Sequence, residues 1–255
     1  MIANYHTHSI RCKHATGTEE EYVRCAIDAG LQILGFSDHT PYPFPGGYVS
    51  SFRMPVEQLA DYADSVRAVQ KQYAGQIQIH LGVEAEYYPK YFPDMVQLLR
   101  DNGVEYMILG QHLLGNEIDT MRDGLPSGDK AKLEQFCNQA IEAMHTGLFT
   151  YFAHPDLFHF EGDKKVYQQH MRRVCKAARE CGIPLELNLL GLYVGRHYPH
   201  PDFFEVVAEE GCQVILGKDA HQPQFLLDQE IVVQGLSILH RFGLEPLDTV
   251  ALRHI

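Results

Sequence analysis

Short apolar stretches alternate with longer amphipathic ones along the whole chain. The apolar stretches predict strands over Ile2–Thr7, Ile33–Ser37, Ile77–Ala85, Tyr106–Gly110, Tyr151–Ala153, Leu185–Leu189 and Cys212–Leu216. The stretches between them predict helices over Glu19–Ala29, Val56–Tyr73, Pro93–Asp101, Lys130–His145, Lys164–Cys181, Pro201–Glu210 and Gln224–Phe242. Glycine follows several of these helices, as expected for a left-handed residue at a helix C-terminus.

The seven strand–helix units follow one another without a linker or a low-complexity stretch, so we expect residues 1–255 to form a single domain. Short apolar strands that alternate with helices predict a parallel sheet whose outer face is covered by helices. Seven or eight such units in about 250 residues favour a closed barrel, with an open doubly wound sheet as the alternative. No Gly-rich phosphate loop follows any predicted strand, which weighs against the open sheet.

The composition excludes several classes of function. The chain has 255 residues and a formal net charge of −12, whereas a nucleic-acid surface needs clustered Lys and Arg. The sequence shows no signal peptide and no apolar segment long enough to span a membrane. Its six cysteines include no C-x2-C pair and are typical of reduced thiols, so we expect a cytoplasmic protein. The unusual feature is the presence of fifteen histidines.

The first of these histidines, His6 and His8, are two residues apart in the first predicted strand. Side chains alternate across a strand, so both imidazoles point to the same side, and His14 follows after a short loop. Imidazole nitrogen is the commonest neutral metal ligand in proteins. Taken alone, a pair of this kind is more often a solvated strand end than half of a metal site.

Residue types that bind metals recur where the other predicted strands end. These are His39, Glu84, His112, His154, Asp219 and His221, while the sixth strand ends in Glu186-Leu187-Asn188 without a histidine. The carboxyl ends of barrel strands meet at one mouth, so these side chains should converge there. The other histidines are interpreted as core or surface residues (His80, His145, His170, His240, His254) or as loop residues near the mouth (His159, His197, His200).

Nine candidate ligands exceed what one metal ion can use, because Zn²⁺ usually takes four ligands. We therefore expect two or three divalent ions, with the carboxylate of Glu84 as the bridge between neighbours. Histidine and carboxylate suit Zn, Fe, Mn or Co, so the identity of the metal stays open. Ions about 3.5–4 Å apart clamp the attacking and leaving oxygens of a phosphoryl displacement. Three such ions would outweigh the charges of Glu84 and Asp219 and create a positive pit suited to a phosphate monoester.

The same residues resemble the polymerase and histidinol phosphatase (PHP) superfamily over essentially the whole chain. The matching positions are His6-x-His8-x5-His14, Ser37-Asp38-His39, Glu84, His112, His154 and Asp219-Ala220-His221. The resemblance implies a distorted seven-stranded (β/α)7 TIM-like barrel with three metals, often Zn, Fe or Mn. It implies one metal on His6, His8, Glu84 and Asp219, a second on His14, His39 and His221, and a third on Glu84, His112 and His154. We expect Glu84, Asp219 and His221 to be the catalytic side chains.

Length and layout are most similar to the histidinol-phosphatase branch, an enzyme of histidine biosynthesis. Departures from that branch are Lys218, where a small residue is usual, and the Gln111-His112-Leu113-Leu114 context. We expect hydrolysis of histidinol phosphate, with Arg53 and Arg196 binding the phosphate. The alternatives are a related phosphatase acting on another small monoester or on phosphotyrosine, and a non-enzymatic metal-binding protein. The expected partner is a small phosphate monoester, not a nucleic acid or a membrane.

Overall fold

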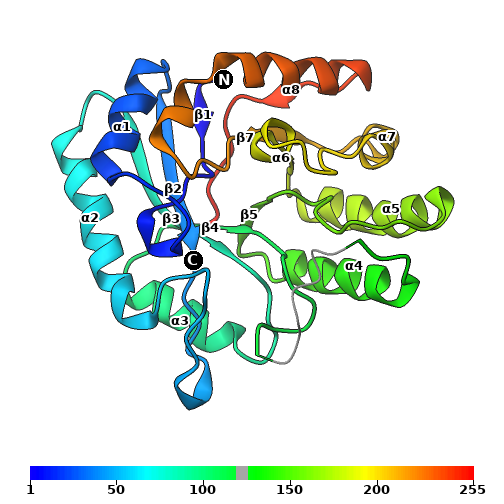
Figure 1. The fold of residues 1–255 in the computed structure, drawn as a ribbon, viewed down its shortest axis with the longest axis horizontal. Coiled ribbons are helices and arrows are strands. Elements are labelled where there is room, and N and C mark those ends of the chain that lie inside the picture. Colours follow the sequence, from blue (N-terminus) through cyan, green and yellow to red (C-terminus); the bar gives the residue numbers. More distant parts are fainter. Residues whose placement is uncertain (119–125) are drawn as a thin grey trace.

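Eight parallel strands form one sheet in the computed structural model, which describes residues 1–118 and 126–255. Neighbours in the sheet are neighbours in the chain, so the order runs from β1 to β8. The sheet curls, and helices cover its outer face (Figure 1). The strands are β1 (Ala3–Asn4), β2 (Ile33–His39), β3 (Gln78–Ala85), β4 (Tyr106–Leu109), β5 (Phe149–Phe152), β6 (Leu185–Asn188), β7 (Val214–Gly217) and β8 (Pro246–Leu247).

The predicted parallel α/β architecture is confirmed, but the predicted count of seven strands is wrong. The additional strand β8 has two residues, Pro246 and Leu247, which pair with the start of β7. A strand this short that begins with proline has no periodicity for a sequence pattern to detect. Beyond the carboxyl ends of β1 and β7, an isolated parallel bridge between Thr7 and Ala220 joins the segments that follow these two strands. The arrangement is consistent with a TIM-like barrel.

The helices lie close to their predicted positions. They are α1 (Glu19–Asp28), α2 (Leu59–Gln72), α3 (Phe92–Asp101), α4 (Lys130–His145), α5 (Lys164–Cys181), α6 (Leu189–Tyr193), α7 (Pro201–Glu210) and α8 (Gln229–Arg241). Thr18 and Glu21 form a capping box at the start of α1. Gly182 and Gly211 end α5 and α7 with φ of 61° and 65°, as predicted from their positions. None of the helices in the described part of the chain is long and apolar enough to cross a membrane.

Two helical segments differ from the prediction because side chains cap the backbone locally. The sequence did not predict α6, whose first turn begins where Asn188 Oδ1 accepts a hydrogen bond of 2.8 Å from the Gly191 amide. The predicted helix 224–242 is divided into a 3₁₀ helix, η4 (Pro223–Leu227), and α8. Asp228 separates the two, since its side chain accepts from the Ile231 amide at 2.9 Å and thereby starts α8.

Lys218, the departure from the family pattern, holds η4 against the end of β7. Its side chain is buried, and its ammonium donates to the carbonyl oxygens of Phe225 (3.1 Å), Leu226 (2.6 Å) and Asp228 (2.8 Å). Burial lowers the pKa of Lys218 to about 8. This lysine therefore has a structural role, because its ammonium is taken up by three backbone carbonyl oxygens.

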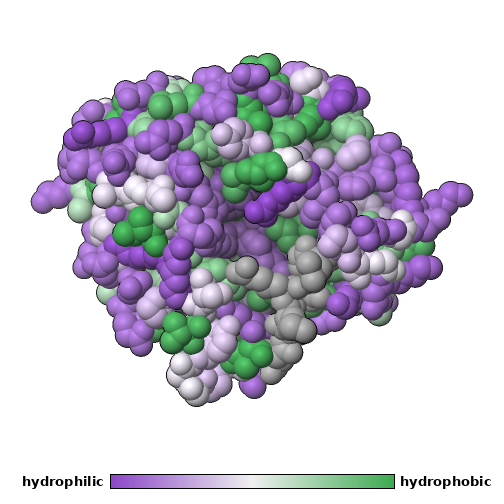
Figure 2. Space-filling model, viewed as in Figure 1, coloured by the Kyte–Doolittle hydropathy of each residue, from purple (hydrophilic) through white to green (hydrophobic). Residues whose placement is uncertain are grey.

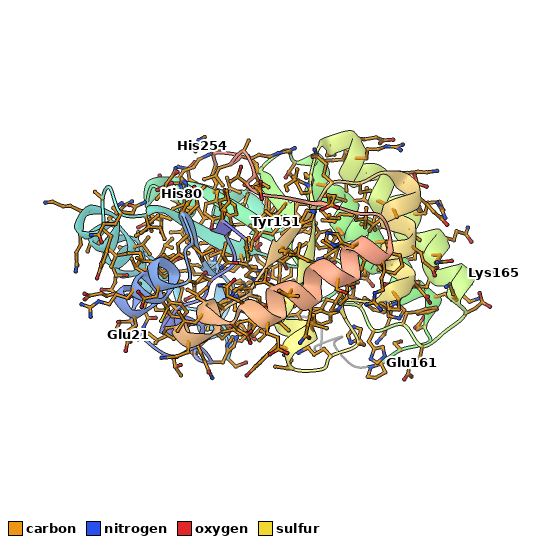
Figure 3. The ribbon with its side chains drawn as sticks, turned by 90° about the horizontal axis from the view of Figure 1, so that it is seen from above. Glu21, His80, Tyr151, Glu161, Lys165 and His254 are labelled. Atoms are coloured by element: carbon orange, nitrogen blue, oxygen red, sulfur yellow. The ribbon has the colours of Figure 1, made fainter. Side chains whose placement is uncertain are left out.

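The inside of the curl is filled by a small apolar cluster that includes Tyr106, Tyr151 and Ile215, while a larger core lies between the sheet and the helices. The far end of the barrel is closed by the last residues of the chain, where His254 bridges to Tyr106. Figure 3 shows His254 and His80 together on the side of the molecule opposite Glu161. His80 contacts Glu105 there, with Nδ1 2.7 Å from Oε2, which agrees with its interpretation as a residue outside the site.

Candidate metal centre

A cavity of about 880 Å³ opens at the carboxyl ends of the strands. Figure 2 shows a hydrophilic hollow near the middle of this face, surrounded by scattered apolar residues. Eight of the nine predicted metal ligands line it: His8, His14, His39, Glu84, His112, His154, Asp219 and His221. The ninth, His6, is fully buried and lies behind them. The structure thus brings together side chains from every predicted strand end that offers a histidine or a carboxylate.

One of the predicted ligand sets, and three of the four members of another, are compact enough for a single ion. His14, His39 and His221 form one group, and His6, His8 and Asp219 form another, with donor atoms within 4.8 Å of one another in each. In the second group, Asp219 Oδ1 lies 3.4 Å from His6 Nε2 and 3.1 Å from His8 Nε2. These distances leave room for an ion between the donors, since metal–donor distances are about 2.0–2.2 Å.

Glu84 lies between the groups, with its two oxygens facing different histidines. Its Oε2 is 3.0 Å from His39 Nδ1 and 3.5 Å from His8 Nε2. Its Oε1 is 2.8 Å from His154 Nε2 and 3.5 Å from His112 Nε2. A carboxylate with this arrangement can serve two ions at once, as expected for a bridging ligand.

Several buried donor atoms of this cluster have no hydrogen-bond partner among the described residues. They are His6 Nε2, His8 Nε2, Glu84 Oε2 and Asp219 Oδ1. Buried polar atoms are almost always satisfied, because burying an unpaired one costs free energy. All four atoms point into the cluster, so bound cations would satisfy them together. The residues therefore fit a multinuclear metal centre.

The protonation of the histidines differs within the cluster. Burial lowers the pKa of His39 to about 4 and, with the nearby His8, the pKa of His221 to about 3. Both are thus neutral at pH 7, which is the form that binds metal. Burial opposes the charged form of His6 as well, but the charges of Asp219, Glu186 and Glu84 outweigh it and raise the pKa of His6 to about 10.

Backbone carbonyls orient two histidines of the group formed by His14, His39 and His221. His14 Nδ1 lies 2.7 Å from the Cys12 carbonyl oxygen, and His221 Nδ1 lies 3.0 Å from the Asp219 carbonyl oxygen. A carbonyl can only accept, so Nδ1 carries the proton in both rings and Nε2 is left free to bind metal. The thiol of Cys12 also lies close to His8 and His221, a contact that the sequence analysis missed.

Glu186 is a second residue that the sequence analysis did not include in the site. Leu185 and Leu187 face the helices, so Glu186 between them points into the curl of the sheet. Its Oε1 is 2.8 Å from His6 Nδ1, and its Oε2 accepts from the His154 amide at 2.9 Å. A carboxylate behind a metal-binding histidine fixes the ring and strengthens it as a ligand. The signal in the sequence was an acidic residue inside an apolar strand.

Two glycines make room for the buried carboxylates. A Cβ atom at Gly110, just after β4, would lie 1.9 Å from Glu84 Oε1. A Cβ atom at Gly217, the last residue of β7, would lie 1.7 Å from Glu186 Oε1. Neither contact is sterically allowed, so the positions of both carboxylates depend on the absence of a side chain on the neighbouring strand.

The two arginines predicted to bind phosphate occupy different places. Arg196 lines the cavity, is exposed, and donates through Nη1 to the Tyr198 hydroxyl at 2.9 Å. Arg53 is not among the cavity-lining residues and is only 1% exposed. Of the three loop histidines near the mouth, His159 and His197 line the cavity and stack on each other, with ring centroids 4.1 Å apart.

A cluster of histidines and carboxylates at the carboxyl ends of a curled parallel sheet covered by helices is the arrangement of a metal-dependent hydrolase. The chain belongs to the PHP domain family, whose model matches residues 4–189. Relatives of this chain are histidinol-phosphatases by name. A probable histidinol-phosphatase of Deinococcus radiodurans is 34% identical over 232 residues, which cover 87% of each chain. The histidinol-phosphatase of Bacillus subtilis is 23% identical over 248 residues, covering 85% of this chain and 92% of its own.

The fold is similar to that of a solved enzyme. The crystal structure of histidinol phosphate phosphatase from Lactococcus lactis, complexed with zinc, L-histidinol and phosphate, matches with a TM-score of 0.75. The match covers 98% of this chain and 96% of that one, at 17% sequence identity. At this identity the comparison shows that the two chains share a fold.

Proposed function

We propose that this chain is a metal-dependent phosphoric monoester hydrolase that converts L-histidinol phosphate to L-histidinol and phosphate in histidine biosynthesis. The observation that carries the proposal is the convergence of the nine predicted ligands on one cluster with Glu84 at its centre. The names of the relatives and the zinc, histidinol and phosphate of the Lactococcus lactis enzyme support the substrate. The expected place of action is the cytoplasm.

The PHP-type domain is proposed to extend over residues 1–255, beyond the matched residues 4–189. Asp219 and His221 follow β7 and contribute to the cluster, with Asp219 Oδ1 3.1 Å from His8 Nε2. In addition, β7 and β8 continue the same parallel sheet. A site that needs residues from both ends of the chain requires the whole chain to fold as one unit.

Two or three divalent ions, Zn, Fe or Mn, are proposed as the cofactors. His6, His8, Glu84 and Asp219 would hold one ion, His14, His39 and His221 a second, and Glu84, His112 and His154 a third. When bound, the ions would supply Lewis acidity to the phosphoryl group and acidify a water molecule. Zinc is present in the Lactococcus lactis structure. The donor set of this chain suits any of the three metals.

The side chains around the ions would bind and orient the substrate. Among the described residues, the Tyr198 hydroxyl is the hydrogen-bond acceptor of Arg196, through Nη1, so the other N–H groups of the guanidinium can donate to phosphate oxygens. The Tyr198 hydroxyl fixes the guanidinium at the cavity wall, and His154 lies beside the Tyr198 ring at a centroid distance of 6.2 Å. Glu186 orients two of these residues, through its contact with His6 Nδ1 and its hydrogen bond from the His154 backbone amide. A cation at the cavity wall, in the cavity that the proposed metal ligands also line, supports the proposal that Arg196 binds the phosphate.

The proposal is tested by turnover on a panel of monoesters with saturating Zn or Mn. We expect kcat/KM for histidinol phosphate to exceed the values for other small phosphate monoesters and for a phosphotyrosine peptide. Higher efficiency on one of those substrates would transfer the function to that substrate and leave the hydrolase chemistry in place. Absence of hydrolysis with every substrate, including a generic aryl phosphate, would favour the non-enzymatic metal-binding alternative.

Replacing Arg196 by alanine is expected to lower kcat/KM roughly ten- to a hundred-fold. The reason is the loss of charge-assisted hydrogen bonds to phosphate, worth about 1.5–3 kcal/mol. Inhibition by inorganic phosphate should weaken in parallel, while the metal content stays unchanged. Arg173 on α5 is a matched control, since it also donates to one neutral side-chain oxygen, that of Asn138 at 2.6 Å. Unchanged turnover and phosphate inhibition in R196A would mean that Arg196 is only a solvated loop residue.

A further inference from the structure

Among the described residues, Arg53 has the largest charged side chain that is fully buried. Its guanidinium lies between two buried carboxylates, with Nε donating to Glu117 Oε2 at 2.6 Å and Nη2 donating to Glu86 Oε2. Its Nη1 donates to the Thr40 carbonyl oxygen at 3.0 Å. All three nitrogens therefore already have an acceptor from the protein.

This environment is unsuited to binding phosphate directly. Two carboxylates more than neutralise one guanidinium, so the group offers no net positive charge to an anion. The ring of Phe52 covers the guanidinium, with its centroid 4.4 Å from Cζ, and Phe52 itself lines the cavity. Direct contact between Arg53 and a phosphate in the cavity would require breaking buried ion pairs, which is costly because a charge would be left unpaired.

Glu86, the partner of Arg53, is in turn bound to a predicted metal ligand. Glu86 Oε1 accepts from the His112 amide at 3.2 Å and lies 3.1 Å from His112 Nδ1. Glu86 Oε2 accepts from the Arg53 guanidinium and Oε1 accepts from the His112 backbone amide, so the Arg53-paired carboxylate can take the Nδ1 proton of His112. The other ring nitrogen, His112 Nε2, then faces Glu84 Oε1 at 3.5 Å.

We propose that Arg53 is a positioning residue of the metal centre, which fixes Glu86 and through it the orientation of His112. The inference rests on the metal centre of the proposed function. The same contacts also join the segments that follow β2 and β4, because Thr40 and Glu117 both accept hydrogen bonds from Arg53. Arg53 fixes Glu86, Glu86 fixes the ring of His112, and His112 would in turn hold the ion proposed to be bound also by Glu84 and His154.

Glu86 and Glu186 are then equivalent in role on opposite sides of the cluster. Each is fully buried or nearly so, and each places one oxygen near the Nδ1 of a histidine whose Nε2 faces Glu84. They differ in what neutralises them. Glu186 contacts the titratable ring of His6 and accepts from the His154 amide and Asn188, whereas Glu86 is paired with the guanidinium of Arg53, which is always charged. Removing Arg53 should therefore affect the His112 side and leave the His6 side unchanged.

The test is titration of metal-stripped protein with Co²⁺ or Zn²⁺, comparing wild type with R53A. We expect R53A to lose affinity about 10- to 100-fold for the ion at the weakest site, the usual effect of removing a group behind a ligand. Added guanidinium ion should restore the affinity by occupying the vacated space, and R53K should lie between wild type and R53A. Inhibition constants for inorganic phosphate, measured with all metal sites saturated, should not change.

Two further variants keep the test decisive if R53A folds poorly. E86Q retains the shape of Glu86 and removes its charge, so it should reproduce the metal defect, and R53A combined with E86Q should add little to either single change. Arg172 on α5 is the matched control, since it also donates to two carboxylates, Glu209 and Glu210, but far from the cavity. R172A should bind metal as wild type does.

Wild-type metal affinity in R53A or E86Q would overturn the inference, as would weakened phosphate inhibition in R53A with all metals bound. Failure of guanidinium to restore R53A, with R53K as defective as R53A, would equally count against it. A wild-type protein that binds metal but hydrolyses no phosphate ester would overturn the proposed function instead, and the comparison of metal affinities would still decide the role of Arg53.

Discussion

Replacing Glu84 by alanine is expected to reduce kcat/KM by about a thousand-fold or more and to lower the number of bound metal ions. Glu84 contacts four histidines of the cluster through two oxygens, at distances between 2.8 Å and 3.5 Å. Its removal would disturb two ions at once and forfeit several kcal/mol of transition-state stabilisation, with about 1.4 kcal/mol for each factor of ten.

Two other variants, H14A and E105A, are compared with E84A. H14A should have a smaller effect, because His14 is exposed and belongs to only one of the predicted ligand sets. E105A is a matched control, since Glu105 also pairs with a histidine, His80, but at the far end of the barrel. Kinetics at saturating metal and elemental analysis of each variant measure both effects. An E84A protein that retained its metal content and most of its rate would show that Glu84 is not a bridge.

Stripping the metal with a chelator is expected to reduce activity to background, and adding back Zn or Mn to restore it with more than one ion per chain. One ion cannot use nine ligands, and the buried atoms without partners lie in more than one compact group. The thermal midpoint of unfolding should fall on stripping, because ions that bind only the folded state stabilise it. Elemental analysis that found one ion or fewer in fully active protein would contradict the multinuclear centre.

Much of the fold was predictable because alternation of short apolar strands and amphipathic helices is a local property of the sequence. The elements that the sequence did not predict are either too short to show a periodic pattern or depend on contacts between residues that are not neighbours in the sequence. The strand β8 has two residues, Pro246 and Leu247, and exists only because β7 lies beside it. The division before α8 depends on capping by Asp228 and on Lys218, whose ammonium binds the carbonyl oxygens around it.

The metal ligands were predictable for a different reason. In a parallel barrel the carboxyl ends of all strands meet at the same face, so residues that follow different strands lie close together. The residues behind the ligands were not predictable, because nothing local connects Glu186 to His6, which are 180 residues apart. Arg53 illustrates the same limit. It lies in a Pro- and Gly-rich segment whose composition indicates an exposed loop, yet the side chain is buried between Glu86 and Glu117. Binding of phosphate by Arg53 stays a prediction that this placement disfavours.

The glycines beside the two buried carboxylates have a consequence for transplanting or redesigning this chemistry. Copying all nine ligands onto another barrel of the same strand order would not reproduce the centre if residues with side chains stood at positions 110 and 217. Added methyl groups there would occupy the space of Glu84 and Glu186, at separations of 1.9 Å and 1.7 Å. A saturation-mutagenesis map of activity should accordingly show these two positions, which contribute no functional group, to be as intolerant of substitution as the ligands themselves.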